Sequence, residues 1–325
     1  MENTKNIQKL LNERVNCPAC NYKDSNEIIK LEWDHEILTK LFKNRNYPLN
    51  FIKEGSYLLL ECIKCSLIYQ KYSPNDDLLD MIYNKWIQNR NNEVYNKKNY
   101  NFNPFYANKT IYNISEISQL LNILPPKPYK HKVLDFGMGW GGWCNAAKLM
   151  GLEVYGMEIT NSQIQYNKAH GLKVISWDEI SGLDFDFINI EQVFEHVDKP
   201  FLLLKQLLSG LSAEGFVKIS VPNASNVKSN LKKDFKTEWF FSKGKKCSLN
   251  SVEPLQHLNG FNYRSLITMS SQLGLQEVNR PIGNFQKNSV GVYTYTNFVK
   301  FSTSTIYRHL KRRQSTNLLF KKVHE

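Results

Sequence analysis

The sequence of 325 residues lacks a long apolar run. Its strongest apolar stretches, Tyr57–Leu60 and Phe201–Leu204, fall far short of the ~18 residues that a membrane-spanning helix needs. The amino terminus, Met1-Glu-Asn-Thr-Lys-Asn, has no apolar segment of the kind that directs secretion. We therefore expect a cytoplasmic protein that does not span a membrane.

Acidic residues are fewer than basic ones: the sequence has 30 Asp and Glu and 42 Lys and Arg, which gives a formal net charge of +12. This balance favours an anionic partner, such as nucleic acid, a membrane surface or an acidic substrate, without choosing among them. The apolar fraction of 42% is ordinary for a globular chain and excludes a wholly disordered one. At roughly 100–200 residues per domain, the length predicts two domains, or one with an appendage.

Cysteine is sparse, with six residues, yet four of them form two C-x-x-C pairs. In a cytosolic chain this pattern predicts a tetrahedral Zn²⁺ site before it predicts disulfides. Strand-like residues on both sides of the second pair, 57–61 and 67–69, indicate the hairpin of a zinc ribbon. The pairs are farther apart than usual, so we expect residues 28–52 to be an inserted excursion. Four thiolates fill the coordination sphere, which makes the site structural. The expected ligands are Cys17, Cys20, Cys62 and Cys65.

Residues 131–301 alternate between strand-like and helix-like segments, which is typical of a parallel sheet covered by helices on both faces. The expected strands are 132–136, 153–157, 173–176, 185–190, 216–221, 275–280 and 291–301, and the expected helices are 141–150, 161–170, 199–209 and 263–273. The predicted division is a zinc-ribbon-like module at 1–72, a helical linker or lid at 73–130, the α/β domain at 131–301 with an insertion at 224–256, and a basic tail at 302–325.

A glycine-rich turn follows the first of these strands. Gly137, Gly139 and Gly142 satisfy G-x-G-x-x-G, and Glu158 follows about twenty positions later. Glycines let the backbone approach a ligand closely, and a carboxylate at 158 suits both hydroxyls of a ribose. The pattern leaves a nicotinamide dinucleotide and another adenosine cofactor open. Asp135, two residues before the first glycine, would repel a pyrophosphate and favours a cationic ligand.

Over residues 131–280 the sequence resembles the class I S-adenosylmethionine-dependent methyltransferases, whose cofactor carries an ammonium and a sulfonium but no phosphate. The resemblance lies in four ordered blocks, Val133–Gly142, Phe185–Pro200, Gly215–Asn223 and Leu255–Leu266. It implies a Rossmann-like α/β fold with a seven-stranded sheet and helices on both faces. The zinc-ribbon-like module in front resembles that of a bacterial subset that modifies sugars and surface polysaccharides.

The same resemblance assigns roles to individual residues along the cofactor. Asp135, Gly137 and Gly139 are expected to hold the methionine end, and Glu158 is expected to hold the ribose. Trp177 and Asp178 are expected to contact the adenine, and Glu191 and Gln192 are expected at the outer edge of the cofactor. Methyl transfer to a hydroxyl also requires a base, and histidine suits this task near neutral pH. His196, in the Glu-His turn, and His257 are the two candidates.

The leading hypothesis is a methyltransferase that acts on a hydroxyl of a sugar or glycan acceptor. An RNA-binding methyltransferase or RNA-binding module is the alternative, because the charge and the zinc ribbon suit RNA equally. An NAD-dependent oxidoreductase is a further alternative, which Asp135 disfavours. The insertion, rich in lysine and aromatic residues, is expected to be a lid above the carboxyl ends of the strands, and the basic tail suits a membrane face or a subunit partner.

Overall fold

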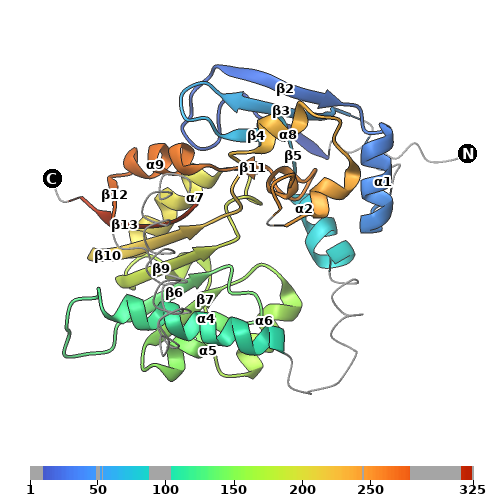
Figure 1. The fold of residues 1–325 in the computed structure, drawn as a ribbon. Coiled ribbons are helices and arrows are strands. Elements are labelled where there is room, and N and C mark those ends of the chain that lie inside the picture. The colour runs from blue at the N-terminus through green and yellow to red at the C-terminus, as the bar shows by residue number, and fades with distance from the viewer. Residues whose placement is uncertain are drawn as a thin grey trace, which may run out of the picture. The chain divides into compact units, whose positions relative to one another are not determined.

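The computed structural model describes residues 10–48, 52, 54–87, 104–243, 245–278 and 316–323. The chain forms two compact units, and each is assembled from segments that are far apart in the sequence (Figure 1). Unit 1 consists of Met1–Lys97, Glu195–Lys199 and Pro222–Phe261. Unit 2 consists of Lys98–Phe194, Pro200–Val221 and Asn262–Glu325.

Unit 2 contains a seven-stranded sheet. Its strands, in spatial order, are β12 (Leu275–Glu277), β13 (Asn317–Lys322), β10 (Leu211–Ser220), β9 (Phe185–Glu191), β6 (Lys132–Phe136), β7 (Glu153–Met157) and β8 (Lys173–Val174). The strands from β10 to β8 are parallel, and β13 runs antiparallel between β10 and β12. The predicted Rossmann-like sheet is confirmed. Strand order reverses at β6, which lies between β7 and β9, and such a reversal is where open α/β sheets bind ligands.

Helices cover both faces of this sheet (Figure 1). α4 (Pro104–Leu121), α5 (Gly142–Leu149) and α6 (Asn161–Ala169) lie along one side, and α7 (Pro200–Leu207) and α9 (Tyr263–Ser271) along the other. Short 3₁₀ turns occupy Trp177–Glu179 and Leu208–Gly210. The central strands are buried on both faces, which explains why six successive residues of β9 are buried.

β13 differs from the expectation of a basic tail at 302–325. Leu318, Leu319 and Phe320 are almost fully buried within the sheet, so these three residues do not face a membrane or a subunit partner. The part of the expected tail at 302–315 lies outside the described residues. The strand expected at 291–301 lies outside the described residues. No helix within the described ranges combines the length and apolar character that crossing a bilayer requires.

Unit 1 contains two antiparallel sheets. The larger has the order β11 (Asn259–Gly260), β4 (Ile68–Gln70), β3 (Tyr57–Cys62) and β2 (Ser25–Leu31), and the smaller pairs β1 (Leu11–Glu13) with β5 (Tyr72–Pro74). β3 and β4 form the expected zinc-ribbon hairpin. The expected excursion contains most of β2 and all of α1 (Glu36–Arg45). The other helical segments of the unit are α2 (Asp76–Asp80), η1 (Met81–Ile87), α8 (Val227–Leu231), η4 (Thr237–Phe241) and η5 (Asn250–Val252).

The insertion at 224–256 packs into the core of unit 1. Phe240 is fully buried and meets the ring of Tyr57 edge-on at 6.3 Å between centroids. The Tyr57 hydroxyl donates a hydrogen bond to the Val252 carbonyl at 2.6 Å, and Arg45 holds both carboxylate oxygens of Glu253 at 2.6 Å. The expected lid is therefore part of the module that the amino-terminal residues form. Its aromatic residue Phe240 belongs to the hydrophobic core of unit 1, because removing apolar side chains from water stabilises the folded protein.

Candidate functional site

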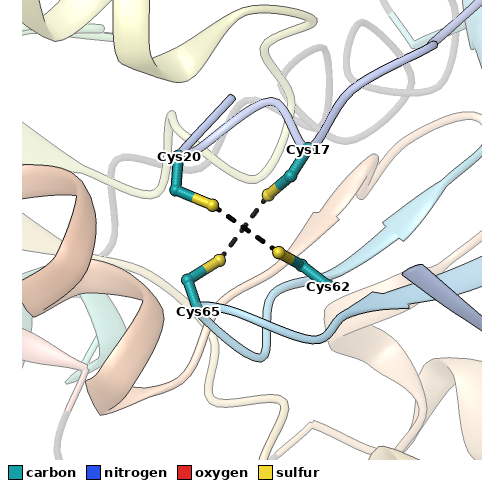
Figure 2. A group of neighbouring side chains, drawn as sticks. All are labelled: Cys17, Cys20, Cys62 and Cys65. Carbon is teal, nitrogen blue, oxygen red and sulfur yellow. Dashed lines mark hydrogen bonds between the residues drawn. The ribbon is translucent and has the colours of Figure 1, made fainter. Parts of the chain in front are cut away.

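Four buried cysteines come together on two matching turns of unit 1 (Figure 2). In the first turn the Asn21 amide donates to the Cys17 carbonyl at 2.8 Å, and in the second the Ser66 amide donates to the Cys62 carbonyl at 2.9 Å. Asn21 and Ser66 both have left-handed φ, 57° and 62°, which aims the sulfurs of each pair toward one point.

The sulfur positions fit one tetrahedral ion. Cys17 Sγ lies 3.6 Å from Cys65 Sγ, and Cys20 Sγ lies 3.5 Å from Cys62 Sγ. Zn–S bonds of about 2.3 Å place tetrahedral thiolates about 3.8 Å apart, so the cluster is nearly arranged for zinc. The sulfur contacts raise the pKa of the Cys17 and Cys65 thiols, as expected where several thiolates crowd together without a cation.

The glycine-rich turn of unit 2 joins β6 to α5 and is held from two sides. Gly137, Gly139 and Gly141 have φ of 79°, 53° and 71°, a region that side chains disfavour. A Cβ at Gly137 would lie 2.5 Å from Val193 Cγ2, so packing requires glycine there. At Gly139 a Cβ would have no atom of the described residues within 4 Å. Gly139 thus opens the backbone to a ligand, whereas Gly141, which the motif does not include, shapes the turn.

Glu158 follows β7 and ties this turn in place. Its Oε2 accepts a hydrogen bond from the Gly139 amide at 3.0 Å, and its Oε1 accepts from the amides of Ile159 and Thr160 at 2.9 Å. A carboxylate fixed by three backbone amides keeps a defined orientation and retains lone pairs for further donors. This arrangement fits the expected hydrogen bonds to the two ribose hydroxyls.

Asp135 lies in β6 beneath the turn and is only 4% exposed. Its Oδ1 accepts from Asn189 Nδ2 at 2.8 Å, and its Oδ2 lies 3.5 Å from Cys144 Sγ. Burial raises the pKa of this carboxyl to about 7, although the hydrogen bond from Asn189 acts in the opposite direction. A cation bound above the turn would compensate the burial of its charge, which suits the methionine end of the cofactor.

Glu191 is the last residue of β9, and Gln192 follows it at the expected edge of the sheet. Glu191 Oε2 accepts from Lys218 Nζ at 3.0 Å, and the same ammonium donates to Glu116 Oε2 of α4 at 2.7 Å. Gln192 is exposed with a left-handed φ of 56°, and its amide donates to the Ser220 carbonyl at 2.7 Å. Glu191 is therefore joined to a buried ion network that the sequence analysis did not include. A lysine in the middle of the apolar run 216–221 was the available signal.

Trp177 and Asp178 begin the 3₁₀ turn after β8. The centroid of the Trp177 ring lies 5.4 Å from that of the Phe136 ring at the end of β6. This contact places the indole beside the glycine-rich turn. Asp178 is exposed. All the expected cofactor residues thus belong to unit 2 and gather around the ends of β6, β7, β8 and β9.

The two expected catalytic histidines lie together in unit 1. Their rings are 4.7 Å apart between centroids and nearly perpendicular, at 72°. His196 Nδ1 is paired with the Gln256 carbonyl at 2.8 Å, and His257 Nδ1 with the Asn250 carbonyl. Burial lowers the pKa of His196 to about 4 and that of His257 well below its ordinary value, so both rings are neutral at pH 7.

Comparison with known proteins supports the reading of unit 2. The family model described as "Methyltransferase domain" matches residues 108–278, slightly more than half of the chain. Among curated protein sequences, none matches this one.

Three solved structures illustrate the overlap with known methyltransferases. The plantazolicin methyltransferase BpumL in complex with SAH is 16% identical, with a TM-score of 0.41, and the match covers 66% of this chain and 85% of that one. A SAM-dependent methyltransferase from Archaeoglobus fulgidus is 14% identical, with a TM-score of 0.36 and coverage of 67% and 97%. A putative methyltransferase in complex with the Haloferax volcanii activator Trm112 is 12% identical, with a TM-score of 0.40 and coverage of 66% and 91%.

The family match includes β6, the glycine-rich turn, β7 and β9, which are the elements that carry the cofactor residues. It sets aside the NAD-dependent oxidoreductase. The chain belongs to the class I S-adenosylmethionine-dependent methyltransferases.

Proposed function

We propose that this methyltransferase acts on a hydroxyl group of a sugar or glycan acceptor in the cytoplasm, and that an anionic acceptor suits it best. The pair of neutral histidines carries the proposal, because a hydroxyl is a poor nucleophile until its proton leaves. The net charge of +12 supports an acceptor that bears phosphate or carboxylate groups.

The residues around the glycine-rich turn fit S-adenosylmethionine. Asp135 and the open backbone at Gly139 would receive its charged methionine end, and Glu158 would receive the ribose. Trp177 and Asp178 would meet the adenine, with Glu191 and Gln192 at the outer edge. The bound cofactor supplies a methyl group on a sulfonium, an activated leaving group. The protein is then left mainly to align the acceptor oxygen and exclude water.

His196 and His257 serve the removal of the acceptor's proton. Each ring turns Nδ1 toward a backbone carbonyl, so that Nδ1 carries the hydrogen and the lone pair is on Nε2. Neutral imidazole with a free Nε2 lone pair is the form that accepts a proton, and both rings hold this form at pH 7.

The four cysteines bind one structural Zn²⁺. The ion would join β3 and β4 to the first turn, at Cys17 and Cys20, and would stabilise a unit whose sheets are small. All four ligands come from the protein, which leaves no position for a substrate.

The acceptor is tested by incubating the purified protein with isotopically labelled cofactor and, in parallel, sugar nucleotides, isolated glycans and total RNA. We expect the label in a sugar or glycan fraction, with a mass gain of one methylene in the product. Label in RNA alone would establish the RNA methyltransferase instead. His196→Gln and His257→Gln should each lower kcat by about 10²–10⁴-fold, the usual contribution of a general base, and leave cofactor affinity unchanged.

A further inference from the structure

Unit 1 contains a second group of side chains with the composition of a metal site. Glu195, His196 and His257 each offer one ligand atom, and these atoms all lie within 4.8 Å of one another. His196 Nε2 lies 3.7 Å from Glu195 Oε1. Glu195 is 1% exposed and His257 is 7% exposed, whereas the side chain of His196 is 26% exposed, so the group is largely buried with one ring at its accessible edge.

The hydrogen bonds of the two rings leave Nε2 as the ligand atom of each. Both Nδ1 atoms face backbone carbonyls, those of Gln256 and Asn250, and therefore carry the hydrogen. Metal-binding histidines characteristically donate the hydrogen of the non-ligating nitrogen to a carbonyl or carboxylate, which fixes the tautomer and the ring. The ligand atoms of the two rings and of the Glu195 carboxylate thus lie close enough together for one ion to bind all three. Like-charged and lone-pair-bearing groups at this separation repel one another unless a cation lies between them.

We propose that Glu195, His196 and His257 bind a divalent transition-metal ion, Zn²⁺ or Fe²⁺, in a site separate from the four cysteines. Imidazole ligands select such ions over Mg²⁺ and Ca²⁺, which prefer oxygen. Two histidines and one carboxylate leave coordination positions open, as in catalytic rather than structural sites. Bonds of about 2.0–2.2 Å place the ligand atoms about 3–4 Å apart, so binding requires roughly 1 Å of side-chain closure.

Nearby cations do not prevent binding. Lys243 and Arg45 both lower the pKa of His257 through their charge, so their fields reach the site. Arg45 is neutralised by its two hydrogen bonds to Glu253. The carboxyl group of Glu195 lies within 4.8 Å of the ligand atoms of both rings, and in its ionised form it would offset the remaining charge of Lys243.

The metal site deepens the proposed function and, in its catalytic consequence, rests on it. A hydroxyl oxygen bound at an open position of the ion loses its proton more readily, because the cation stabilises the alkoxide. The proton would pass to solvent, and the oxygen would then form the bond to the methyl carbon as the S–CH3 bond breaks and releases the thioether. The histidines would thus act as ligands and serve deprotonation through the ion, since one Nε2 lone pair cannot bind a metal and a proton together.

Metal content tests the site in the full-length protein, stripped with a chelator and reloaded with Zn²⁺ or, anaerobically, with Co²⁺ as a spectroscopic probe. We expect two ions per chain, one with the thiolate-to-cobalt charge-transfer bands of the cysteine site and one without them. Glu195→Gln preserves the side-chain volume and should weaken the second site by at least about tenfold. His257→Ala should abolish it. His170→Ala, which changes an exposed histidine of unit 2, should keep both ions.

One ion per chain, bound by the cysteines alone in the parent protein and in every variant, would overturn the proposal. If His257→Ala does not fold, the Glu195→Gln variant decides whether the second site exists. If Glu195→Gln binds both ions with the affinity of the parent protein, the proposed site is rejected. Calorimetry with S-adenosylmethionine reports on unit 2 independently. Loss of the second ion with normal cofactor binding leaves the methyltransferase assignment intact, and two ions in a protein that methylates no hydroxyl leave the metal site intact.

Discussion

At Asp135, folding and cofactor binding act on the carboxyl group in opposite directions. Its pKa is about 7 in the folded chain against an ordinary value of 3.8, because burial disfavours the charged form. The folded state therefore holds the proton more tightly than the unfolded state between about pH 4 and 7. Stability falls as the pH rises through that window. A cationic ligand favours the ionised form, so its affinity should rise over the same window.

Asp135→Asn separates these two effects. The variant should show a weaker fall in stability from pH 4 to 7 than the parent, because it has no charge to bury. Its affinity for S-adenosylmethionine should be nearly independent of pH, whereas that of the parent should rise by up to about tenfold per pH unit below 7. Thermal denaturation and calorimetry across this range measure both. If the affinity for S-adenosylmethionine depends on pH in the same way in the parent and the variant, the charge of Asp135 does not contribute to cofactor binding.

The open backbone at Gly139 gives a second prediction at the scale of one residue. Gly139→Ala adds a methyl group where no described atom lies within 4 Å, so the cost to folding is only the ~1–2 kcal/mol of a left-handed φ. Cofactor binding should weaken by more than tenfold, because the methyl group occupies the approach of the ligand. Gly182→Ala is the matched control, with φ of 92° and an equally open surrounding. Calorimetry should show normal cofactor affinity for Gly182→Ala, and an equal loss in both variants contradicts the assignment.

Among the elements, β10 contains the ion network that fixes α4 to the sheet. Lys218 is fully buried and binds Glu116 and Glu191, while Glu116 also accepts a hydrogen bond from Trp143 Nε1 at 3.0 Å. Lys218→Met should lower the free energy of unfolding by about 3–5 kcal/mol, because it leaves carboxylates without their cation. Lys321→Met, on the neighbouring strand β13, removes the more exposed pair with Glu214 and a cation–π contact with Phe216 at 5.8 Å, and should cost about 1 kcal/mol. Urea denaturation of both variants decides whether the network stabilises the sheet.

The hairpin of β3 and β4 depends in the same way on zinc. Cys62→Ser should reduce the zinc content of the cysteine site to near zero and lower the melting temperature of unit 1. Cofactor affinity, which rests on unit 2, should be unchanged. Cys247→Ser is the control, because Cys247 lies in unit 1 outside the cluster and is only partly buried. Elemental analysis that finds no zinc in the reduced parent protein contradicts the prediction.

Elements with strong local patterns were predictable from the sequence. The strands at 132–136 and 153–157 match β6 and β7 residue for residue, because buried parallel strands are short apolar runs bounded by turns. β13 was not predictable in this way. Its three apolar residues stand among lysines, and only pairing with β10 and β12 shows that they are buried. The network of Lys218 likewise joins residues 102 positions apart, a separation that no local pattern reports.

For the whole molecule, the sequence predicted an amino-terminal module followed by a domain with an insertion. The structure instead builds unit 1 from one segment before the methyltransferase strands and two segments between them. Hydrophobic periodicity identifies which residues need burial but not which partner buries them, so the insertion could not be assigned to its unit. The histidine pair illustrates the same point, since His196 and His257 are 61 positions apart and meet only through tertiary packing.

This division predicts that unit 2 cannot be isolated by removing the amino-terminal module. A chain of residues 98–325 would retain 222–261 without the partner that covers Phe240, Leu249, Val252 and Leu255, all at most 1% exposed in the whole protein. Exposing four such side chains costs about 6–12 kcal/mol, comparable to the entire stability of a domain. We expect the truncated chain to aggregate or to bind a hydrophobic dye, and residues 1–97 supplied as a separate polypeptide to restore a monomeric complex that binds the cofactor. Size-exclusion chromatography and calorimetry measure both. A truncated chain that is monomeric, dye-negative and binds S-adenosylmethionine like the parent would show that the insertion folds without the amino-terminal module.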